Sequence, residues 1–333
     1  MKEAVRDPRE LCRVLELPAE FEAPAIRAAR LFPLFAPRSY LDRIERGNPR
    51  DPLLRQILPL DEEFDHPEGF SDDPVGDLEA TKSPGLLQKY RGRVLMITTG
   101  ACAIHCRYCF RRHFPYEHTP PSAEVWSESI RVIAADESIH EVILSGGDPL
   151  TIVDPLLAEL ADRLAAIPHL ARLRIHTRLP IMIPERVNDE LLAWLRGTRL
   201  TPIVVIHANH PAELQSTAAG AIGRLVDAGV PVINQSVLLR GVNDDLETLV
   251  ALSERLVELR AMPYYLHQLD RVSGAAHFEV PVSRGLELID ELQSRLPGYA
   301  VPRYVREEAE AAHKILLSAN NDLVVARSPD RAM

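Results

Sequence analysis

The sequence lacks any apolar run long enough to cross a bilayer, although 46% of its 333 residues are hydrophobic. Its first residues, Met-Lys-Glu-Ala-Val-Arg-Asp, do not form the apolar core of a signal peptide. The chain also lacks an excess of positive charge, because its net charge is −10. This charge argues against a non-specific nucleic-acid-binding surface, which would be basic. We therefore expect a cytoplasmic protein, whose thiols stay reduced and available to a metal.

Cysteine is scarce, with four residues in the chain, and three of them lie close together at Cys102, Cys106 and Cys109. This C-x3-C-x2-C spacing brings three thiolates to one ligand and leaves a tetrahedral zinc site one ligand short. Zinc with His105 or His113 as fourth ligand is one interpretation. An iron–sulfur cluster is the other, since three thiolates on a four-iron cluster leave one iron open to a substrate or cofactor.

A regular alternation of strand-like and helix-like stretches begins at Val94. We predict strands at 94–98, 141–144, 173–176, 203–207, 232–237 and 264–267, and helices near 123–135, 154–166, 187–195, 212–227, 245–259 and 283–295. The repeat is about 30 residues, the size of a βαβ unit, and continuous apolar strands indicate a parallel sheet covered on both faces. We expect an α/β fold, a partial (β/α)6 barrel, with a flat doubly wound sheet as the alternative.

The segments on either side of these units differ in character. Residues 1–58 are predicted to form short helices interrupted by prolines, with Cys12 as a small core residue. Residues 59–85 are acidic and rich in proline and glycine, which predicts an irregular surface connection. Near the other end we expect an extended segment at 299–305 and an acidic helix at 306–317.

This pattern divides the chain into three parts. They are an N-terminal helical region and linker at 1–90, the partial barrel at 91–298, and a C-terminal segment at 299–333.

Polar motifs follow nearly every predicted strand at its C-terminal end, where barrel enzymes build their active sites. They are the segment Cys102–Phe114 (the cysteine loop), Ser145-Gly146-Gly147-Asp148, His176-Thr177-Arg178, His207-Ala208-Asn209-His210, Gln235-Ser236 and Gln268-Leu269-Asp270. This placement favours the barrel over a flat sheet. We therefore expect these motifs to surround one site.

Individual side chains near the cysteines suit particular ligands. The Gly146-Gly147 turn lets backbone approach a ligand and expose N–H groups to its amino and carboxylate ends. Arg111, two residues after the last cysteine, can hold a carboxylate with two parallel hydrogen bonds. Arg93 can serve a phosphate. Lys314, taken by sequence alone, is a helix residue paired with Glu310.

Eight stretches of the sequence resemble those of the radical S-adenosylmethionine (SAM) superfamily and, within it, those of the lysine 2,3-aminomutases. The similarity is to the short bacterial form that makes β-lysine for modifying elongation factor P. The stretches are Tyr90–Leu95, Cys102–Tyr116, Leu144–Leu150, His207–Pro211, Asn234–Asp244, Tyr264–Asp270, Gly274–Phe278 and Gly298–Pro302. Two positions depart from the family pattern: Glu308–His313 replaces a glycine-rich run, and Lys89 replaces an arginine found in many relatives.

The resemblance implies a role for each matching residue. Cys102, Cys106 and Cys109 would hold a [4Fe–4S] cluster. Gly146 and Gly147, with Ser145, Asp148, His207 and Gln235, would bind SAM, while Lys314, Tyr90 and Arg93 would hold pyridoxal 5′-phosphate (PLP), Lys314 covalently. Arg111 would bind the substrate carboxylate, and Asp270 and Glu307 would bind the distal ammonium of lysine.

The resemblance also implies an activity and partners. The activity is an isomerisation of L-α-lysine to β-lysine, supplied with electrons by a flavodoxin- or ferredoxin-type donor. The product would serve elongation factor P and the ligase that modifies it. The alternatives are an aminomutase for another amino acid, a radical SAM enzyme without PLP, and a non-catalytic zinc or iron–sulfur binding protein.

Overall fold

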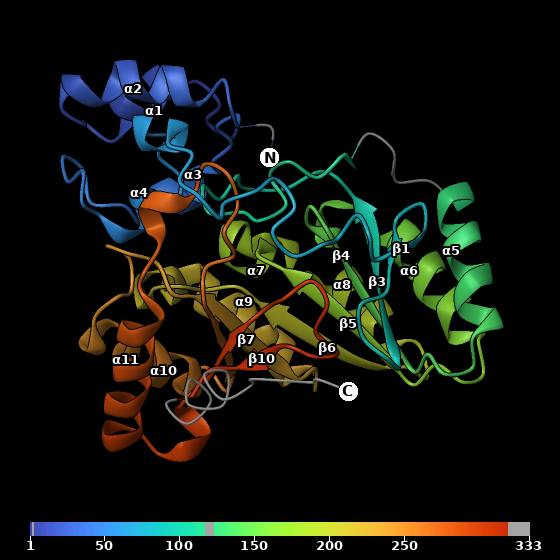
Figure 1. Ribbon diagram of the computed structural model, residues 1–333. Helices are drawn as coiled ribbons and strands as arrows, with labels where there is room; N and C mark the ends of the chain where they lie inside the picture. Colours follow the sequence, from blue (N-terminus) through green and yellow to red (C-terminus); the bar gives the residue numbers. More distant parts are fainter. Residues whose placement is uncertain (2, 117–122, 319–333) are drawn as a thin grey trace, which may run out of the picture.

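The computed structural model describes residues 1, 3–116 and 123–318. A ten-stranded sheet lies at its centre, with the strands in the same order as in the sequence (Figure 1). The parallel strands are β3 (Arg93–Thr99), β4 (Glu141–Gly146), β5 (Arg172–Thr177), β6 (Thr201–Ile206), β7 (Val232–Val237), β8 (Met262–His267) and β9 (Arg303–Arg306). The two edges of the sheet do not meet, so the barrel is open.

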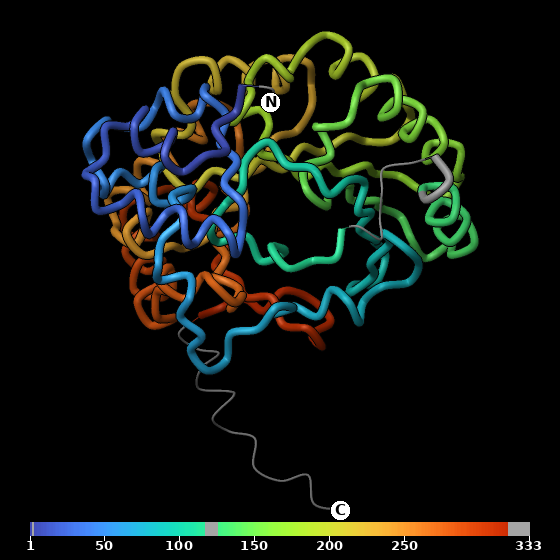
Figure 2. The backbone as a smooth tube through the Cα atoms, turned by 90° about the horizontal axis from the view of Figure 1, so that it is seen from above, coloured from blue at the N-terminus to red at the C-terminus, as the bar shows by residue number. Residues whose placement is uncertain are grey.

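Short antiparallel strands complete both edges. β1 (Thr81–Ser83) and β2 (Leu86–Leu87) precede β3, and β10 (Ile315–Leu316) pairs with β9. The elements curve round a common centre in the view of Figure 2. The expected α/β partial barrel is therefore confirmed, and the flat doubly wound alternative is not the fold.

Helices follow the parallel strands as predicted and cover the outside of the sheet (Figure 1). They are α5 (Ala123–Ala135), α6 (Asp154–Ala165), α8 (Asp189–Arg196), α9 (Ser216–Asp227), α10 (Leu246–Glu258) and α11 (Val282–Arg295). Leu157, Leu160 and Leu164 of α6 recur at helical spacing and are fully buried, which explains why this helix lies against the sheet. The sequence periodicity alone was sufficient to place these helices.

The N-terminal part consists of short helices, as expected from its prolines. They are α1 (Pro8–Val14), α2 (Glu22–Ala28), α3 (Arg38–Leu41) and α4 (Pro52–Arg55). Another short helix, α7 (Leu179–Met182), follows β5. Single 3₁₀ turns lie at Ala19–Phe21, Asp61–Phe64, Pro149–Thr151, Pro184–Arg186, Pro211–Leu214, Ala276–Phe278 and Gly298–Ala300.

One large core unites the N-terminal helices with the barrel, because Leu11 and Leu53 belong to the same buried cluster as Leu144 and Ile175. Cys12 is buried on α1, as predicted. A second cluster fills the space beneath α10 and α11. The division of the chain at residues 90 and 298 stays a prediction. Among the described residues, no helix is both long enough and apolar enough to span a membrane.

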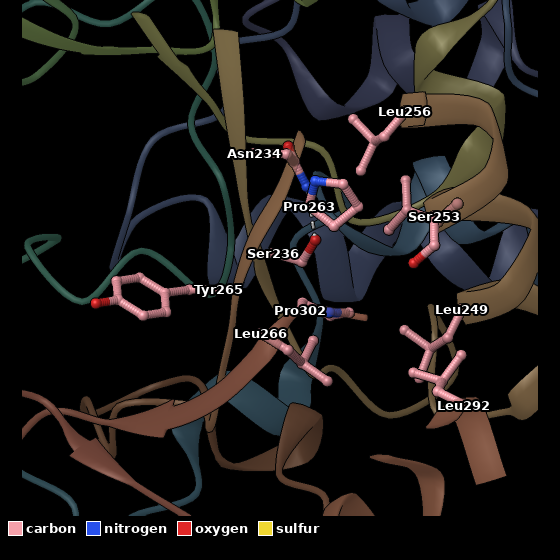
Figure 3. Close-up of a pocket in the computed structure, with 11 residues that line it drawn as sticks. Asn234, Ser236, Leu249, Ser253, Leu256, Pro263, Tyr265, Leu266, Leu292 and Pro302 are labelled. Carbon is pink, nitrogen blue, oxygen red and sulfur yellow. Dashed lines mark hydrogen bonds between the residues drawn. The ribbon is translucent and has the colours of Figure 1, made fainter. Parts of the chain in front are cut away.

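A small cavity lies between β7, β8 and α10 (Figure 3). Its volume is about 10 Å³, roughly the space of a single water molecule. Leu249, Leu256 and Leu292 pack on its helix side, whereas Tyr265 points to the other side of the strands. This cavity is a packing gap, and the larger site lies on the side to which Tyr265 points.

The predicted acidic helix at 306–317 is wrong. Turns and bends follow β9, and the chain then returns as β10, with Ile315 opposite Arg306. The Glu310–Lys314 pair is replaced by an ion pair between Lys314 and Glu307. Sheet hydrogen bonds and the burial of Leu317 in the second core cluster outweigh the local helix preference.

The predicted surface connection at 59–85 is wrong in part. Much of it is irregular, but Glu63 and Asp77 are 1% and 2% exposed. Both carboxylates are buried because arginine or lysine side chains contact them. The segment therefore contributes charged groups to the interior of the protein.

Candidate active site

A cavity of about 510 Å³ opens at the C-terminal ends of the parallel strands. Every residue with a predicted binding role lines it: Tyr90, Arg93, Cys102, Cys106, Cys109, Arg111, Ser145, Gly146, Gly147, Asp148, His207, Gln235, Asp270, Glu307 and Lys314. Ala208, Asn209, His210, Ser236 and Gln268 of the strand-end motifs do not line it. Parallel strands bring their C-terminal ends to one edge, which explains why residues so distant in sequence meet. The volume suits a small molecule with its cofactors.

The cysteine loop after β3 is fixed by buried ion pairs. Glu63 accepts hydrogen bonds from Arg107 Nε at 2.7 Å and from Arg112 Nη2 at 2.7 Å. Both guanidinium groups lie over the ring of Phe32, at 4.9 and 4.8 Å from its centre. The N-terminal region therefore holds the loop on both sides of Cys109, which the sequence did not indicate.

The three cysteines of the loop line the same cavity and are partly exposed. Burial, together with the charge of neighbouring cysteines, raises the pKa of Cys102 and raises that of Cys109 to about 11. Arg178 Nη1 donates to Cys106 Sγ at 2.7 Å. Neighbouring thiolates repel one another unless a cation lies between them, and the iron ions of a cluster supply that charge.

Mononuclear zinc does not fit this loop. Of the two candidate fourth ligands, His113 does not line the cavity that holds the cysteines. In the part of the chain that the structure describes, no three or more His, Cys, Asp or Glu residues are grouped to hold a metal ion. A cluster of several iron ions spans a wider triangle of thiolates than one zinc ion does.

The Gly146-Gly147 turn differs from expectation in one respect. Its N–H groups are not exposed to a ligand: Gly147 N donates to Thr99 O at 2.7 Å, and Asp148 N donates to Ala101 O at 2.7 Å. The glycines are needed because the cysteine loop passes so close. A Cβ on Gly147 would lie 2.2 Å from Ala101 O, and Gly146 has a φ of 121°. The turn therefore supports the cysteine loop directly.

We expect Gly147→Ala to displace the cysteine loop and lower the iron content of the reconstituted protein several-fold. Gly223→Ala is the matched control, because its Cβ meets nothing within 4 Å in α9. That change should leave iron content intact and stabilise the helix by up to about 1 kcal/mol. Iron analysis and thermal unfolding of both variants test this, and normal iron binding in Gly147→Ala would contradict it.

A row of alternating charges lines the cavity. Lys314 pairs with Glu307, and Glu307 Oε1 lies 3.0 Å from Lys89 Nζ. Lys89 Nζ lies 2.6 Å from Asp77 Oδ1, and Arg111 Nε lies 2.6 Å from Asp77 Oδ2. Burial alone would raise the pKa of Glu307, but Lys314 and Lys89 outweigh it and lower the value to about 2.

Several polar atoms at the cavity are buried without a partner among the described residues. They are Tyr90 Oη, His176 Nε2, His267 Nε2 and Asp270 Oδ1. Buried polar groups in proteins are nearly always paired, so these atoms indicate a polar ligand. His176 belongs to a predicted strand-end motif, and His267, which was not predicted, also lies at a strand end. Asp77 had no such signal.

Asp270 and His207 have strongly shifted pKa values. Burial and the negative charge of Glu307 raise the pKa of Asp270 to about 7. Burial and the positive charge of Arg178 lower the pKa of His207 to about 3, so its ring is neutral. Arg93 lies over the ring of Tyr90, 4.6 Å from its centre. The cavity thus combines thiols, neutral imidazoles, cations and carboxylates within one enclosure.

Comparison with known proteins gives the family. Residues 96–252 match the radical SAM superfamily. L-lysine 2,3-aminomutase of Haemophilus influenzae is 46% identical over 95% of this chain and 94% of its own, and that of Escherichia coli is 46% identical over 92% and 90%. The Clostridium subterminale enzyme is 32% identical over 100% and 80%.

Among solved structures, a radical SAM methyltransferase from Sphaerobacter thermophilus overlaps 66% of this chain and 68% of its own, at 18% identity and a TM-score of 0.46. The match to the curated relatives extends over nearly the whole length of the chain. The chain therefore belongs to the L-lysine 2,3-aminomutase family of the radical SAM superfamily.

Proposed function

We propose that this protein is an enzyme that converts L-α-lysine to β-lysine by moving the amino group from Cα to Cβ. One observation carries the proposal: a single cavity is lined by the three cysteines, Lys314, Arg111, Asp270 and Glu307. Arg111 suits the carboxylate of an amino acid, and Asp270 and Glu307 suit a distal ammonium. An amino acid with a cationic side chain matches this distribution of charge.

The cofactors of the superfamily are a [4Fe–4S] cluster and SAM. We assign the cluster to Cys102, Cys106 and Cys109, whose thiols line the cavity together. We assign SAM to the neighbouring side of the cavity, lined by Ser145, Gly146, Gly147, Asp148, His207 and Gln235. When bound, cluster and SAM supply the radical chemistry of the family.

We assign PLP to Lys314, Tyr90 and Arg93. Lys314 lines the cavity beside unpartnered buried polar atoms, including Tyr90 Oη, which fit a polar aromatic cofactor. Arg93 places a guanidinium where a phosphate can be bound. When bound, PLP supplies the electron-delocalising ring that migration of an amino group requires.

The protein itself binds and orients the substrate and excludes water. Burial on this side of the cavity strengthens each charge interaction relative to water. A substrate ammonium that found no partner here would cost several kcal/mol. Asp270 and Glu307 therefore favour lysine and oppose glutamate or a neutral amino acid.

The pKa of Asp270, raised to about 7, gives substrate binding a pH dependence. The carboxyl group is ionised and attracts ammonium above that pH, and it is neutral below it. The apparent KM for lysine should therefore rise as pH falls below about 7, by about tenfold per unit at the steepest. Asp270→Asn should raise KM and remove this dependence. A wild-type KM that is flat from about pH 8 to about pH 6 would contradict the assignment.

The cellular role that we propose is cytoplasmic supply of β-lysine for elongation factor P and its ligase, with electrons from a flavodoxin- or ferredoxin-type protein. Two points support it. The chain resembles the short bacterial form, and its identity is higher to the Haemophilus and Escherichia relatives, at 46%, than to the Clostridium enzyme, at 32%.

The experiment that tests the activity uses protein reconstituted anaerobically with iron, sulfide and PLP. Reductant, SAM and α-lysine are added, and the amino acids are separated and identified. β-Lysine is the expected product. If no β-lysine forms but another amino acid gives its β-isomer, the substrate assignment fails. If no amino acid is converted, the aminomutase assignment fails for this protein.

A further inference from the structure

Asp77 is held in place by the turn that carries it. Its backbone N–H donates to Asp73 Oδ1 at 2.8 Å, and that of Leu78 donates to Asp73 Oδ2 at 3.0 Å. A Cβ on Gly76 would lie 2.8 Å from Ala309 Cβ, so this turn packs tightly on the segment between β9 and β10. The Asp77 carboxylate is thereby fixed between the cysteine loop and the end of the chain that carries Glu307.

The two oxygens of Asp77 contact different cations. Oδ2 accepts a hydrogen bond from Arg111 Nε at 2.6 Å, and Oδ1 lies 2.6 Å from Lys89 Nζ. Lys89 Nζ in turn donates to Glu307 Oε1 at 3.0 Å. The Asp77–Lys89 pair thus joins Arg111 to Glu307, the groups proposed for opposite ends of the substrate.

The contact with Asp77 determines which edge of the Arg111 guanidinium is available to bind a ligand. Nε is bound to Asp77, and Nη1 donates to Ser145 Oγ at 3.3 Å. Nη2 donates to no residue that the structure describes, and the side chain lines the cavity. A carboxylate entering the cavity would therefore meet a guanidinium whose rotation is already restricted.

The charges of Asp77 and Lys89 also keep Arg111 apart from Glu307. Without the carboxylate of Asp77, Arg111 would be drawn towards Glu307, which Lys89 already contacts at 3.0 Å, and towards Asp270 in the same cavity. Those contacts would neutralise the carboxylates that the substrate ammonium needs. The alternation of charge therefore preserves two separate sites of opposite sign.

We propose that Asp77 is a positioning residue that, together with Lys89, fixes the separation between Arg111 and Glu307 and so selects lysine by its length. The inference rests on the proposed lysine aminomutase function. Asp77 itself contacts neither end of the substrate. It acts through the two residues that do.

The test compares lysine with ornithine, which is one methylene shorter, in steady-state kinetics. Asp77→Asn keeps the shape of the side chain but removes its charge. We expect KM for lysine to rise roughly 10- to 100-fold with a smaller change in kcat, as for other residues that orient a binding group. The preference for lysine over ornithine should fall, because the two binding groups are no longer held at a fixed separation.

Lys89→Gln removes the cation that contacts both Asp77 and Glu307. Lys89→Arg keeps a positive charge at this position. We expect Lys89→Gln to raise KM for lysine in the same way and Lys89→Arg to recover most of the loss. Lys89→Gln also decides the question if Asp77→Asn folds poorly or holds less iron. Glu79→Gln is the matched control, because Glu79 is exposed in the same segment, and it should behave as wild type.

The outcomes separate the two proposals. A wild-type protein that makes no β-lysine overturns the proposed function. An active wild type whose folded Asp77→Asn or Lys89→Gln variant keeps both its KM and its preference for lysine overturns the positioning role alone. Equal losses in kcat for lysine and ornithine, with KM unchanged, also overturn it, because they indicate general damage to the fold.

Discussion

Replacing Cys106 with alanine is expected to abolish β-lysine formation and most iron binding. Cys102, Cys106 and Cys109 line one cavity, and a cluster held by two thiolates is left with two irons that lack a protein ligand. Arg178, which donates to Cys106 Sγ at 2.7 Å, also loses its sulfur partner. Iron and sulfide analysis, with product formation measured on the same preparation, tests the expectation.

Cys12→Ala is the control for this experiment. Cys12 is buried on α1 and does not line the cavity. Its replacement should cost about 1 kcal/mol of stability at most and leave iron content and turnover unchanged. The cluster assignment fails if Cys106→Ala retains full iron and activity, or if Cys12→Ala loses as much iron as Cys106→Ala.

Replacing Lys314 with alanine is the second change expected to remove activity completely. The amino group of Lys314 is the one we assign to covalent attachment of PLP, and alanine offers no substitute for it. The visible absorption of lysine-bound PLP should be absent from the variant. Iron content should be normal, because the cysteine loop is held by Glu63 and not by Lys314.

Lys314→Arg separates the charge of the residue from its covalent role. Arginine keeps a cation beside Glu307, the ion-pair partner of Lys314, but it does not form the covalent link. We expect it to remain inactive while matching the thermal stability of wild type more closely than Lys314→Ala does. Lys82→Ala, at an exposed lysine on β1, should be fully active. Turnover by Lys314→Arg would show that PLP is not attached at this residue.

The sequence was sufficient to predict the barrel because its evidence was local and repeated. Strands such as β4 and β6 are short apolar runs, and the leucines of α6 recur at helical spacing. The polar motifs at the strand ends then predicted a shared site, since parallel strands end at one edge. The roles of Cys102, Lys314 and their neighbours came from resemblance to the family.

Local patterns were misleading where distant parts of the chain decide the structure. Residues 306–317 have the composition of an acidic helix, yet β10 pairs with β9 there. The hydrogen bonds gained by that pairing and the burial of Leu317 depend on strands far away in sequence. No property of residues 306–317 alone predicts these hydrogen bonds or this burial.

The sequence by itself therefore determined the order of strands and helices, the cysteine loop and the edge of the sheet that carries the site. Only the tertiary structure revealed that Asp77 lies between Arg111 and Lys89, and that Glu63 anchors the cysteine loop. The physical reason is that a carboxylate is buried only when cations from elsewhere surround it. Periodicity reports which face of an element is buried, whereas ion pairing depends on which elements the fold brings together.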